Sequence, residues 1–399
     1  MMHTLDTDIV IIGGGIAGLW LLKSLSQQGY STLLLESHKL GGEQTVKSQG
    51  IIHGGTKYAL SGNLTSASEC IAGMPDRWRS CIEGKGELDL SATRVLSPHH
   101  YMWSSAGLGS KMTAFFASKA LRGRVDQLKP KGYPAFFQHP SFKGTLYQLN
   151  EFVLDIPSLV SSLTDGLHEH TLAVDWSCSQ INRDESGAIR NISLGGYDDP
   201  VQLKAQRYIF TSGAGTAELI QHWGVEGPKM QLRPLHMTLV KVPGAEPLFA
   251  HCIGTSTLPR LTITSHPDNN GDWIWYIGGE PAESGVKRDH EQQIAACRQE
   301  LQQLMPWIDL SEAQWSTLRV DRAEPKQNSL LRPDAAYCKA LHNAFISWPT
   351  KLALAPNLGD EVRDQLKQQD VVPQHSQPER PSFLRSPEPA QPFWQGAFE

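Results

Sequence analysis

The most regular pattern of apolar and polar residues lies near the start of the chain. Apolar residues at 9–12 predict a buried strand, and the glycines at 13–15 predict a turn into a helix. A second run, Thr32–Leu35, predicts another strand and ends at the acidic Glu36. Strand, glycine turn, helix, strand and acid in this order are typical of a unit that holds the ADP half of a dinucleotide.

The glycines of this turn differ in the role that each has in such a unit. Gly13 lets the chain turn tightly, Gly15 lets the backbone approach a pyrophosphate, and Gly18 lets the helix pack closely on the sheet. The helix beginning near Gly15 directs N–H groups and its positive dipole end at the phosphates. Glu36 is placed to accept hydrogen bonds from a ribose hydroxyl, and its charge disfavours NADP. A glycine turn alone also occurs in proteins that bind no ligand. Here the strand before the turn, the helix after it and the acid at the end of the second strand together favour dinucleotide binding.

A second unit of similar layout is expected later in the chain. A strand over 205–211 leads into the turn Ser212–Gly215 and a helix over 216–222. Residues 156–167 predict a helix with Asp155 as its cap and a proline in its first turn. Further strands are expected at 93–103, 144–155, 171–176, 179–183 and 189–194, with a helix over 111–121.

A different pattern follows the second unit. Residues 230–242, 258–265 and 272–279 alternate between apolar and polar, which predicts half-buried strands of a separate sheet, and 288–304 predict a helix. We therefore expect an α/β fold in which a nucleotide-binding domain is interrupted twice by a mainly antiparallel α+β substrate domain. The expected boundaries are 1–75, 150–228 and 322–366 for the first domain, and 76–149 and 229–321 for the second. Residues 367–399 are rich in Pro, Gln and Ser, which predicts a disordered tail.

Length, charge and cysteine spacing exclude several classes of protein. The 399 residues suffice for two domains, and a net charge of −5 offers no basic surface for nucleic acid. We expect no signal peptide, since a basic leader is missing, and no apolar run is long enough to span a membrane. The six cysteines contain no C-x-x-C pair, which argues against a disulfide framework or zinc knuckle and favours a cytoplasmic protein.

Three segments resemble known flavoproteins. Thr45–Leu60, TVKSQGIIHGGTKYAL, resembles the flavin-contacting loop of FAD-dependent glycerol-3-phosphate dehydrogenases and the His-x-Gly loop of L-2-hydroxyglutarate oxidase, with Lys57 in place of the family arginine. Trp348–Leu354, WPTKLAL, resembles the Gly-Gly-Lys-Leu-Thr segment that closes over the flavin, although Pro349–Thr350 replaces the two glycines. Leu331–Asp334, LRPD, is similar to the family's Arg-Pro element.

Together these segments resemble the D-amino-acid-oxidase-like superfamily of FAD oxidoreductases. The resemblance implies a Rossmann-like FAD-binding domain and hydride transfer from a substrate C–H bond to the flavin. We expect FAD to be held without a covalent bond and the substrate to be a small anionic hydroxy acid, polyol phosphate or amino acid. The electron acceptor stays open. The residues expected at the cofactor are Gly13, Gly15, Ile16, Ala17, Gly18, Glu36, Ser37, Ser48, Gln49, Gly50, Ile52, Gly54, Cys178, Gly213, Ala214, Pro349, Thr350 and Leu352.

His53, Lys351 and Arg332 are the expected catalytic residues. His53, which precedes two glycines, has two interpretations: a proton acceptor facing the flavin, or a loop histidine bonded to a backbone carbonyl. The resemblance favours the first interpretation. A basic residue near the flavin N1–C2 oxygen stabilises the charge of reduced flavin, although lysines and arginines are more often solvated surface residues. Substrate contacts are expected from Lys57, Tyr58 and Arg233.

Other clusters of polar residues are weaker candidates for a functional site. Arg233, His236, His251 and the aromatic strand Trp273–Tyr276 are candidates for a pocket wall, but alternating aromatics more often belong to a core. Asp321, Arg322 and Glu324 are expected to form an ion-pair corner. His99–His100, His168 and His170 lack matched ligands, so we expect no metal. Two rival functions remain: an aromatic-ring monooxygenase, and a flavin-binding interaction protein without catalysis.

Overall fold

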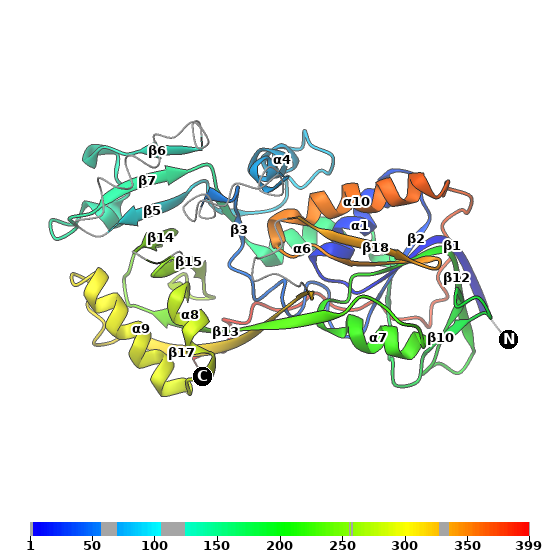
Figure 1. The fold of residues 1–399 in the computed structure, drawn as a ribbon. Helices are drawn as coiled ribbons and strands as arrows, with labels where there is room; N and C mark the ends of the chain where they lie inside the picture. The colour runs from blue at the N-terminus through cyan, green and yellow to red at the C-terminus, as the bar shows by residue number, and fades with distance from the viewer. Residues whose placement is uncertain are drawn as a thin grey trace.

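The computed structural model describes residues 3–56, 70–104, 124–254, 256, 258–326 and 335–398. They form two lobes that lie side by side, and the long strands β13 (Met230–Lys241) and β17 (Gln314–Pro325) run from one lobe into the other (Figure 1). Each lobe is built on its own large sheet. The expected α/β fold class is confirmed.

The first lobe contains five parallel strands in the order β9, β2, β1, β12 and β19. Antiparallel strands β10 and β11 pair beside β12, and β18 pairs with β19. The bounds are β1 (His3–Ile12), β2 (Thr32–Glu36), β9 (Thr171–Ala173), β10 (Gln180–Arg183), β11 (Ile189–Leu194), β12 (Val201–Phe210), β18 (Tyr337–Leu341) and β19 (Ala344–Trp348).

Helices cover both faces of this sheet, which explains its unbroken apolar strands. Ile9 and Ile11 of β1 pack with α1 (Ile16–Gln27), α6 (Ile156–Thr164) and α10 (Ala355–Gln368) on one face. Val10 and Ile12 point to the opposite face, where α7 (Thr216–Trp223) packs (Figure 1). Successive strand residues point to opposite faces, so a strand covered on both sides is apolar at every position.

The helix expected at 156–167 is confirmed as α6, with its start as expected. Asp155 caps it by accepting a hydrogen bond from the backbone N–H of Ser158 at 3.2 Å, and Pro157 lies in the first turn. Proline suits this position because its missing N–H would lack an intrahelical partner there. The strand, turn and helix expected over 205–222 are likewise confirmed as β12, the 3₁₀ turn η5 (Gly213–Gly215) and α7.

The second lobe holds an eight-stranded, mainly antiparallel sheet in the order β17, β13, β16, β15, β14, β5, β7 and β6. A small third sheet joins β3, β8 and β4. The remaining bounds are β3 (Ile51–Ile52), β4 (Val95–Ser97), β5 (His100–Ser104), β6 (Val125–Gln127), β7 (Thr145–Leu149), β8 (Phe152–Leu154), β14 (Ala250–Ile253), β15 (Leu261–Pro267), β16 (Trp273–Gly278), α4 (Met74–Ile82), α8 (Glu280–Ser284), α9 (His290–Leu304), η2 (Pro130–Gly132), η3 (Ala135–Gln138), η4 (His168–His170), η6 (Gly285–Lys287) and η7 (Leu352–Leu354).

Two expected strands are each divided between two sheets. The stretch 93–103 breaks at Pro98 into β4 and β5, and 144–155 breaks at 150–151 into β7 and β8. β4 pairs with β8 in the small sheet, whereas β5 pairs with β7 in the large one. Proline lacks the N–H that a continuous ladder needs, which explains the first break. The expected helix over 111–121 lies outside the described residues.

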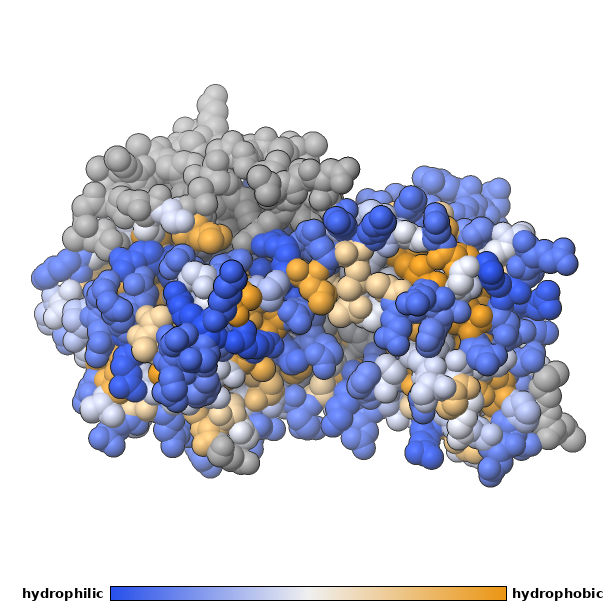
Figure 2. Space-filling view, turned by 60° about the horizontal axis from the view of Figure 1, so that its bottom comes forward, coloured by the Kyte–Doolittle hydropathy of each residue, from blue (hydrophilic) through white to orange (hydrophobic). Residues whose placement is uncertain are grey.

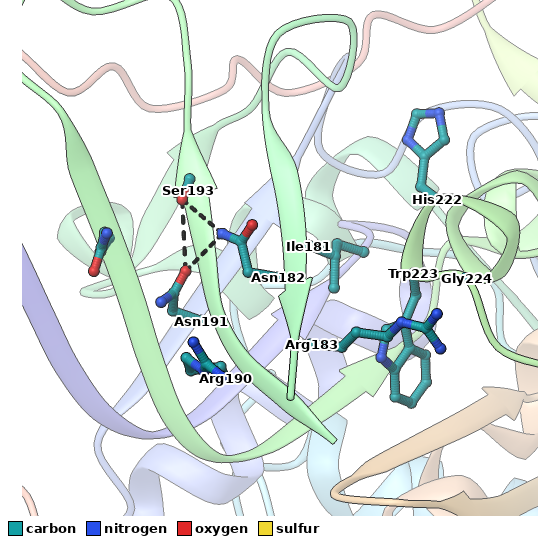
Figure 3. A pocket seen from close by; sticks show the side chains of 10 residues that line it. Ile181, Asn182, Arg183, Arg190, Asn191, Ser193, His222, Trp223 and Gly224 are labelled. Carbon is teal, nitrogen blue, oxygen red and sulfur yellow. Dashed lines mark hydrogen bonds between the residues drawn. The ribbon is translucent and has the colours of Figure 1, made fainter. Parts of the chain in front are cut away.

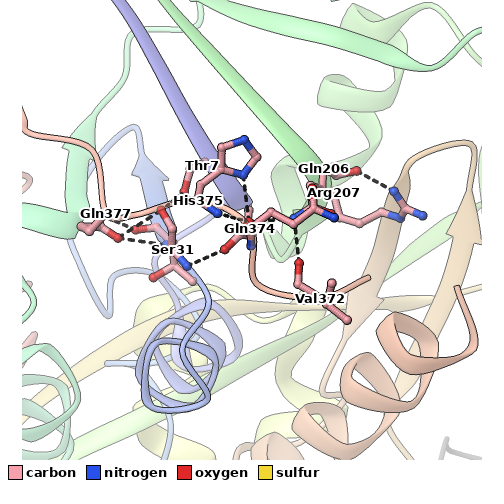
Figure 4. Close-up of polar contacts among 10 residues, drawn as sticks. Thr7, Ser31, Gln206, Arg207, Val372, Gln374, His375 and Gln377 are labelled. Atoms are coloured by element: carbon pink, nitrogen blue, oxygen red, sulfur yellow. Dashed lines mark hydrogen bonds and ion pairs between the residues drawn. The ribbon is translucent and has the colours of Figure 1, made fainter. Parts of the chain in front are cut away.

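The prediction of a disordered tail over 367–399 is wrong for residues 367–398. Asp8 of β1 is fully buried and accepts hydrogen bonds from the backbone N–H groups of Gln374 and His375 at 2.9 and 3.1 Å (Figure 4). The His375 Nδ1 atom lies 2.9 Å from the same carboxylate. Burial alone would raise the pKa of Asp8, but the donors from His375, Gln374, Ser31 and Gln206 together lower it.

The next part of the tail continues along the first lobe. The Gln377 side chain donates to the Thr32 carbonyl at 3.0 Å and accepts from the Thr32 N–H at 3.1 Å. Leu40 then donates its N–H to the Glu388 carbonyl, and its own carbonyl accepts from Ala390, both at 2.8 Å. The tail is therefore ordered by backbone pairing with the body of the protein, which its polar composition does not indicate.

The last aromatic residues of the tail pack in the second lobe. Trp394 is 3% exposed, stacks on His266 with ring centroids 4.3 Å apart, and donates to the Pro267 carbonyl at 3.2 Å. Complete burial lowers the pKa of His266 to about 4, so this ring is neutral beneath the indole. The C-terminus accordingly lies beside β17, while α10 lies in the other lobe (Figure 1).

Figure 2 shows a face on which hydrophobic residues form separate patches within a largely hydrophilic surface. Among the described residues, the exposed large apolar side chains are Val95 of β4, Leu232 of β13, and Val372 and Phe383 of the C-terminal segment, and single exposed apolar residues of this kind are usual on a protein surface. Within the described ranges, no helix is long and apolar enough to cross a membrane.

Candidate active site

The loops that follow the parallel strands meet along one edge of the first sheet. Ile12 of β1 lies beside Leu35 and Phe210, and Phe210 lies beside Ile346 of β19, so the strands end at the same level. In open α/β sheets, ligands bind in the crevice outside these carboxyl ends. The glycine turn at 13–15, Glu36, the turn 211–215 and the segment 349–352 therefore share one side of the molecule.

The two glycine turns are in direct contact. Gly13 has a φ of 112°, and a Cβ on it would lie 2.7 Å from the Ser212 backbone. A Cβ on Gly18 would lie 1.9 Å from the Gly13 carbonyl oxygen, so the helix can approach the turn only with glycine there. Gly15 differs, since among the described residues its Cβ would meet the Thr45 hydroxyl alone, at 3.3 Å. Gly15 therefore borders open space at the start of α1.

Glu36 holds the first turn from the side. Its carboxylate accepts hydrogen bonds from the Gly14 N–H at 2.6 Å and from the His38 N–H at 2.7 Å. The neighbouring Ser37 is exposed, and its hydroxyl lies 2.9 Å from His38 Nδ1. Glu36 thus lies at the end of β2 next to the glycine turn, the position that a ribose-binding acid occupies in such units.

The sequence pattern missed two residues that support this turn. The Thr45 hydroxyl accepts a hydrogen bond from the Ile16 N–H at 2.9 Å and so caps α1 from a distant loop. Leu40 packs against Gly14, where a Cβ would lie 2.7 Å from the leucine side chain. Neither contact has a local signal, because the partners lie more than twenty residues apart in the chain.

The segment that contains His53 is held by a buried carboxylate. Glu151 is 2% exposed and accepts hydrogen bonds from the Gly54 and Thr56 N–H groups at 3.2 and 3.4 Å. His53 is half-buried between β3 and these two amides. Glu151 lies between β7 and β8, so the division of that expected strand is what brings it here.

The preceding residues attach the same loop to the second lobe. The Gln49 amide donates to the carbonyls of Thr262 and Tyr276 at 3.1 and 3.0 Å. The Tyr276 hydroxyl donates to the Lys47 carbonyl at 2.9 Å, and its complete burial raises its pKa. Gln49, expected to contact the cofactor, thus binds β15 and β16 with its side chain, and Tyr276 supports the loop.

The end of β19 contacts the turn Ser212–Gly215, and the segment after β19 packs beside the His53 loop. The Trp348 indole donates to the Gly213 carbonyl at 3.2 Å, and the Thr350 hydroxyl donates to the Ala335 carbonyl at 3.1 Å. The Trp78 indole of α4 donates to the Ala353 carbonyl at 2.9 Å. Because η7 also packs on β3, the residues around Lys351 and those around His53 are neighbours in space.

Several expected site residues lie elsewhere or outside the described ranges. Cys178 is exposed in a turn beyond β9, where its thiol lies 3.5 Å from the Asp175 carbonyl. Its backbone packs on Gly195, at the end of β11. Lys57, Tyr58 and Arg332, like the rest of the LRPD segment, are outside the described residues.

Arg233 is engaged in ion pairs. Its guanidinium lies 3.4 Å from Glu324, whose side chain is 8% exposed, and 3.9 Å from Glu283. Arg322 also pairs with Glu283, at 3.2 Å. Of the expected corner, Arg322 and Glu324 each form an ion pair, but the pairs are with Glu283 and Arg233, and Asp321 is an exposed strand residue. These carboxylates balance the charge that Arg233 would offer a substrate.

His236 and His251, the candidates for a pocket wall, form hydrogen bonds within the fold. His236 is buried with Nδ1 3.1 Å from the Gly285 carbonyl, and burial lowers its pKa. His251 packs edge-on against His100 at 4.3 Å and lies 2.8 Å from the Thr262 hydroxyl. Among the residues that the structure describes, no group of three or more His, Cys, Asp or Glu could hold a metal ion.

A polar groove of about 670 Å³ lies away from this edge, between the β10–β11 hairpin and the C-terminal end of α7 (Figure 3). Among the residues that line it, Asn182 donates hydrogen bonds to Asn191 and Ser193, both at 2.8 Å. Gln202 also lines it, near the start of β12. At a rise of roughly 3.3 Å per residue, Gln202 lies about 26 Å from the carboxyl end of that strand, so the groove is separate from the glycine turns.

Comparison with known proteins decides the family. The model of the DAO family, described as FAD dependent oxidoreductase, matches residues 8–344. The chain belongs to this family. The probable FAD-dependent oxidoreductase PA4991 of Pseudomonas aeruginosa is 48% identical over 401 residues, which cover 100% of both chains. The crystal structure of that FAD dependent oxidoreductase matches with a TM-score of 0.86 at 43% identity, also covering 100% of both chains.

Two other similarities are weaker, the first because it is short and the second because its sequence identity is low. Glycerol-3-phosphate dehydrogenase 1 of Mycobacterium bovis is 35% identical over 57 residues, 14% of this chain and 11% of the relative. Glycine oxidase from Geobacillus kaustophilus matches with a TM-score of 0.63 at 12% identity, covering 94% and 97% of the two chains. At that identity the likeness shows the fold alone.

The DAO-family chain is therefore an FAD-dependent oxidoreductase, as the three motifs indicated. The site residues fit the cofactor: Glu36 lies at the end of β2, Gly15 borders open space at the start of α1, and the close contact of Gly13 with Ser212 brings the two glycine turns together. These features suit a ribose, a pyrophosphate and an extended dinucleotide, respectively.

Proposed function

We propose that the protein oxidises a small anionic metabolite, a hydroxy acid, polyol phosphate or amino acid, by removing a hydride from carbon. The observation that carries this proposal is the proximity of the His53 and Lys351 loops, through β3 and η7, beside the two glycine turns. Bound FAD supplies the hydride acceptor. The chain then has to orient the substrate, accept a proton and balance the added negative charge.

His53 is the residue that we assign to proton acceptance. A general base must be held within hydrogen-bond reach of the proton that it takes. The two hydrogen bonds from Gly54 and Thr56 to Glu151 restrict the loop that contains His53. Glu151 therefore supports the orientation of the imidazole from a buried position.

Lys351 is the residue that we assign to charge stabilisation. It is half-buried, and its neighbours on both sides are held by hydrogen bonds from Thr350 to Ala335 and from Trp78 to Ala353. A cation that is already held beside the flavin stabilises the negative charge of the reduced ring, and the protein does not have to rearrange during the reaction. Because Arg233 is paired with Glu324 and Glu283, we assign the anionic group of the substrate to Lys57 and Arg332 rather than to Arg233.

An anaerobic screen tests the proposed reaction. The purified protein is expected to be yellow and to release FAD on denaturation, since we propose a non-covalent cofactor. Hydroxy acids, amino acids and polyol phosphates are added without oxygen, and bleaching of the flavin absorbance identifies a substrate. If none of these classes bleaches the flavin but an aromatic compound consumes oxygen with NADH or NADPH, the monooxygenase interpretation replaces ours. No reaction with any class would favour a flavin-binding interaction protein.

Replacing Lys351 by methionine is expected to slow flavin reduction by roughly a hundredfold or more, because one preorganised charge-stabilising group is removed. FAD should stay bound, since methionine retains most of the apolar stem. Stopped-flow absorbance with the substrate found in the screen measures the rate. Lys339→Met, at an exposed position of β18, is the matched control. If Lys351→Met reduces the flavin at the wild-type rate, Lys351 has no charge-stabilising role and is an ordinary surface residue.

His53→Ala is expected to slow reduction by roughly a hundredfold or more at neutral pH, because the proton acceptor is lost. The defect should become smaller as the pH rises, since hydroxide then takes part of the role of the imidazole. Rates measured from about pH 6 to about pH 10 against the exposed control His222→Ala test this. A defect of the same size at every pH would show that His53 only supports the loop.

A further inference from the structure

Four described residues other than glycine have a positive φ: Glu43, His342, Thr350 and Asp370. His342 lies in the turn between β18 and β19, and Asp370 follows the end of α10. Left-handed residues are usual in hairpin turns and after helices. Thr350, with a φ of 63°, is the β-branched member of the four, and a β-branched side chain is strained in this region.

The surroundings of Thr350 keep it in this conformation. Its hydroxyl donates to the Ala335 carbonyl at 3.1 Å. On one side Pro349 has its φ restricted by its ring, and Trp348 is bound to Gly213 at 3.2 Å. On the other side the Lys351 carbonyl accepts from the Leu354 N–H at 3.0 Å, which begins η7. The strained residue is therefore fixed between the end of β19 and the start of η7.

We propose that Thr350 is a positioning residue whose left-handed conformation, locked by its hydroxyl, directs Lys351 toward the flavin. This inference rests on the proposed function, which assigns Lys351 to the flavin. Strained residues persist only where their surroundings hold them, and they concentrate at functional sites. Glycine adopts the same φ without strain but is free to leave it. Threonine with its hydrogen bond holds the turn in one state, so the Lys351 ammonium stays in place.

The flavin midpoint potential of the holoenzyme tests the proposal without a substrate. Lys351→Met is expected to make the potential more negative, since it removes the cation that stabilises reduced flavin. Thr350→Gly should shift it in the same direction by a smaller amount. Thr350→Ser keeps the hydroxyl and should therefore have the same potential as the wild-type protein. His342→Gly relieves a positive φ far from the site and should leave the potential unchanged.

A double-mutant cycle shows whether Thr350 acts through Lys351. In the background of Lys351→Met, the change Thr350→Gly should cause no further shift, because the cation that it positions is already absent. Equal shifts in both backgrounds would overturn the proposal, as would a wild-type potential in Thr350→Gly or a full shift in Thr350→Ser. If Lys351→Met itself leaves the potential unchanged, the charge-stabilising role in the proposed function fails as well. If the potential shifts in Lys351→Met but not in Thr350→Gly, only the role of Thr350 is overturned.

Discussion

Deleting residues 369–399 is expected to leave a chain that does not form a stable fold. The deletion uncovers the sites of Leu384 and Trp394, which are 2% and 3% exposed. Loss of one buried tryptophan side chain costs about 3–5 kcal/mol, and loss of one leucine about 2–5 kcal/mol. It also removes the Gln374 and His375 donors from Asp8, a carboxylate that is fully buried in the intact chain. The sum is comparable to the total stability of a typical domain, about 5–15 kcal/mol.

A single substitution makes this prediction measurable in a folded protein. Trp394→Ala is expected to lower the free energy of unfolding by about 3–5 kcal/mol, and urea unfolding followed by circular dichroism measures the change. Glu379→Ala, at an exposed position of the same segment, is the control and should lie within about 0.5 kcal/mol of the wild type. A truncated protein with wild-type stability and flavin content would show that the packing of the tail contributes nothing.

Two glycine substitutions are expected to separate cofactor binding from folding. Gly15→Ala adds a methyl group whose nearest neighbour is the Thr45 hydroxyl at 3.3 Å, so the apoprotein should remain folded. The methyl group enters the space where the backbone would approach the pyrophosphate. We expect the FAD dissociation constant to rise by roughly a hundredfold or more, equivalent to about 2.7 kcal/mol. Titration of apoprotein with FAD, followed by flavin fluorescence, measures the constant.

Gly18→Ala is the companion variant with a different expected result. Its methyl group would lie 1.9 Å from the Gly13 carbonyl oxygen, so the helix or the turn must move. Such overpacking costs about 1–3 kcal/mol or more, and both stability and FAD affinity should fall. If Gly15→Ala bound FAD as tightly as the wild type, the phosphates would not lie at the start of α1.

The first nucleotide unit was predictable because its evidence is local. A strand covered on both faces is apolar throughout, a tight turn at φ of 112° needs glycine, and both signals lie within a few residues. The Asp155 cap and the proline of α6 were predictable for the same reason. The motifs around His53 and Lys351 likewise led to the FAD-dependent family that the comparisons show.

The supports of the site depended on contacts between distant residues. Glu151 reaches the loop of His53 from almost a hundred positions away, and Thr45 caps a helix that begins before it in the chain. Such partners leave no periodic pattern in the sequence. Contacts between distant residues also decided that the two halves of each divided strand enter different sheets, because each half pairs with different neighbours.

The C-terminal segment shows most clearly the difference between what the composition of a segment predicts and what its tertiary contacts decide. Its Pro-rich, polar composition predicts disorder because such a chain cannot bury enough apolar surface by itself. In the protein this segment packs on the rest of the chain: Leu384 and Trp394 are buried in the first and second lobe, respectively, and Asp8 accepts hydrogen bonds from its backbone. Local pattern and turn chemistry therefore determined the first nucleotide unit, α6 and the turn between β12 and α7. The tertiary structure decided how distant segments pair, because burial and hydrogen bonding depend on surfaces that exist only after the chain has folded.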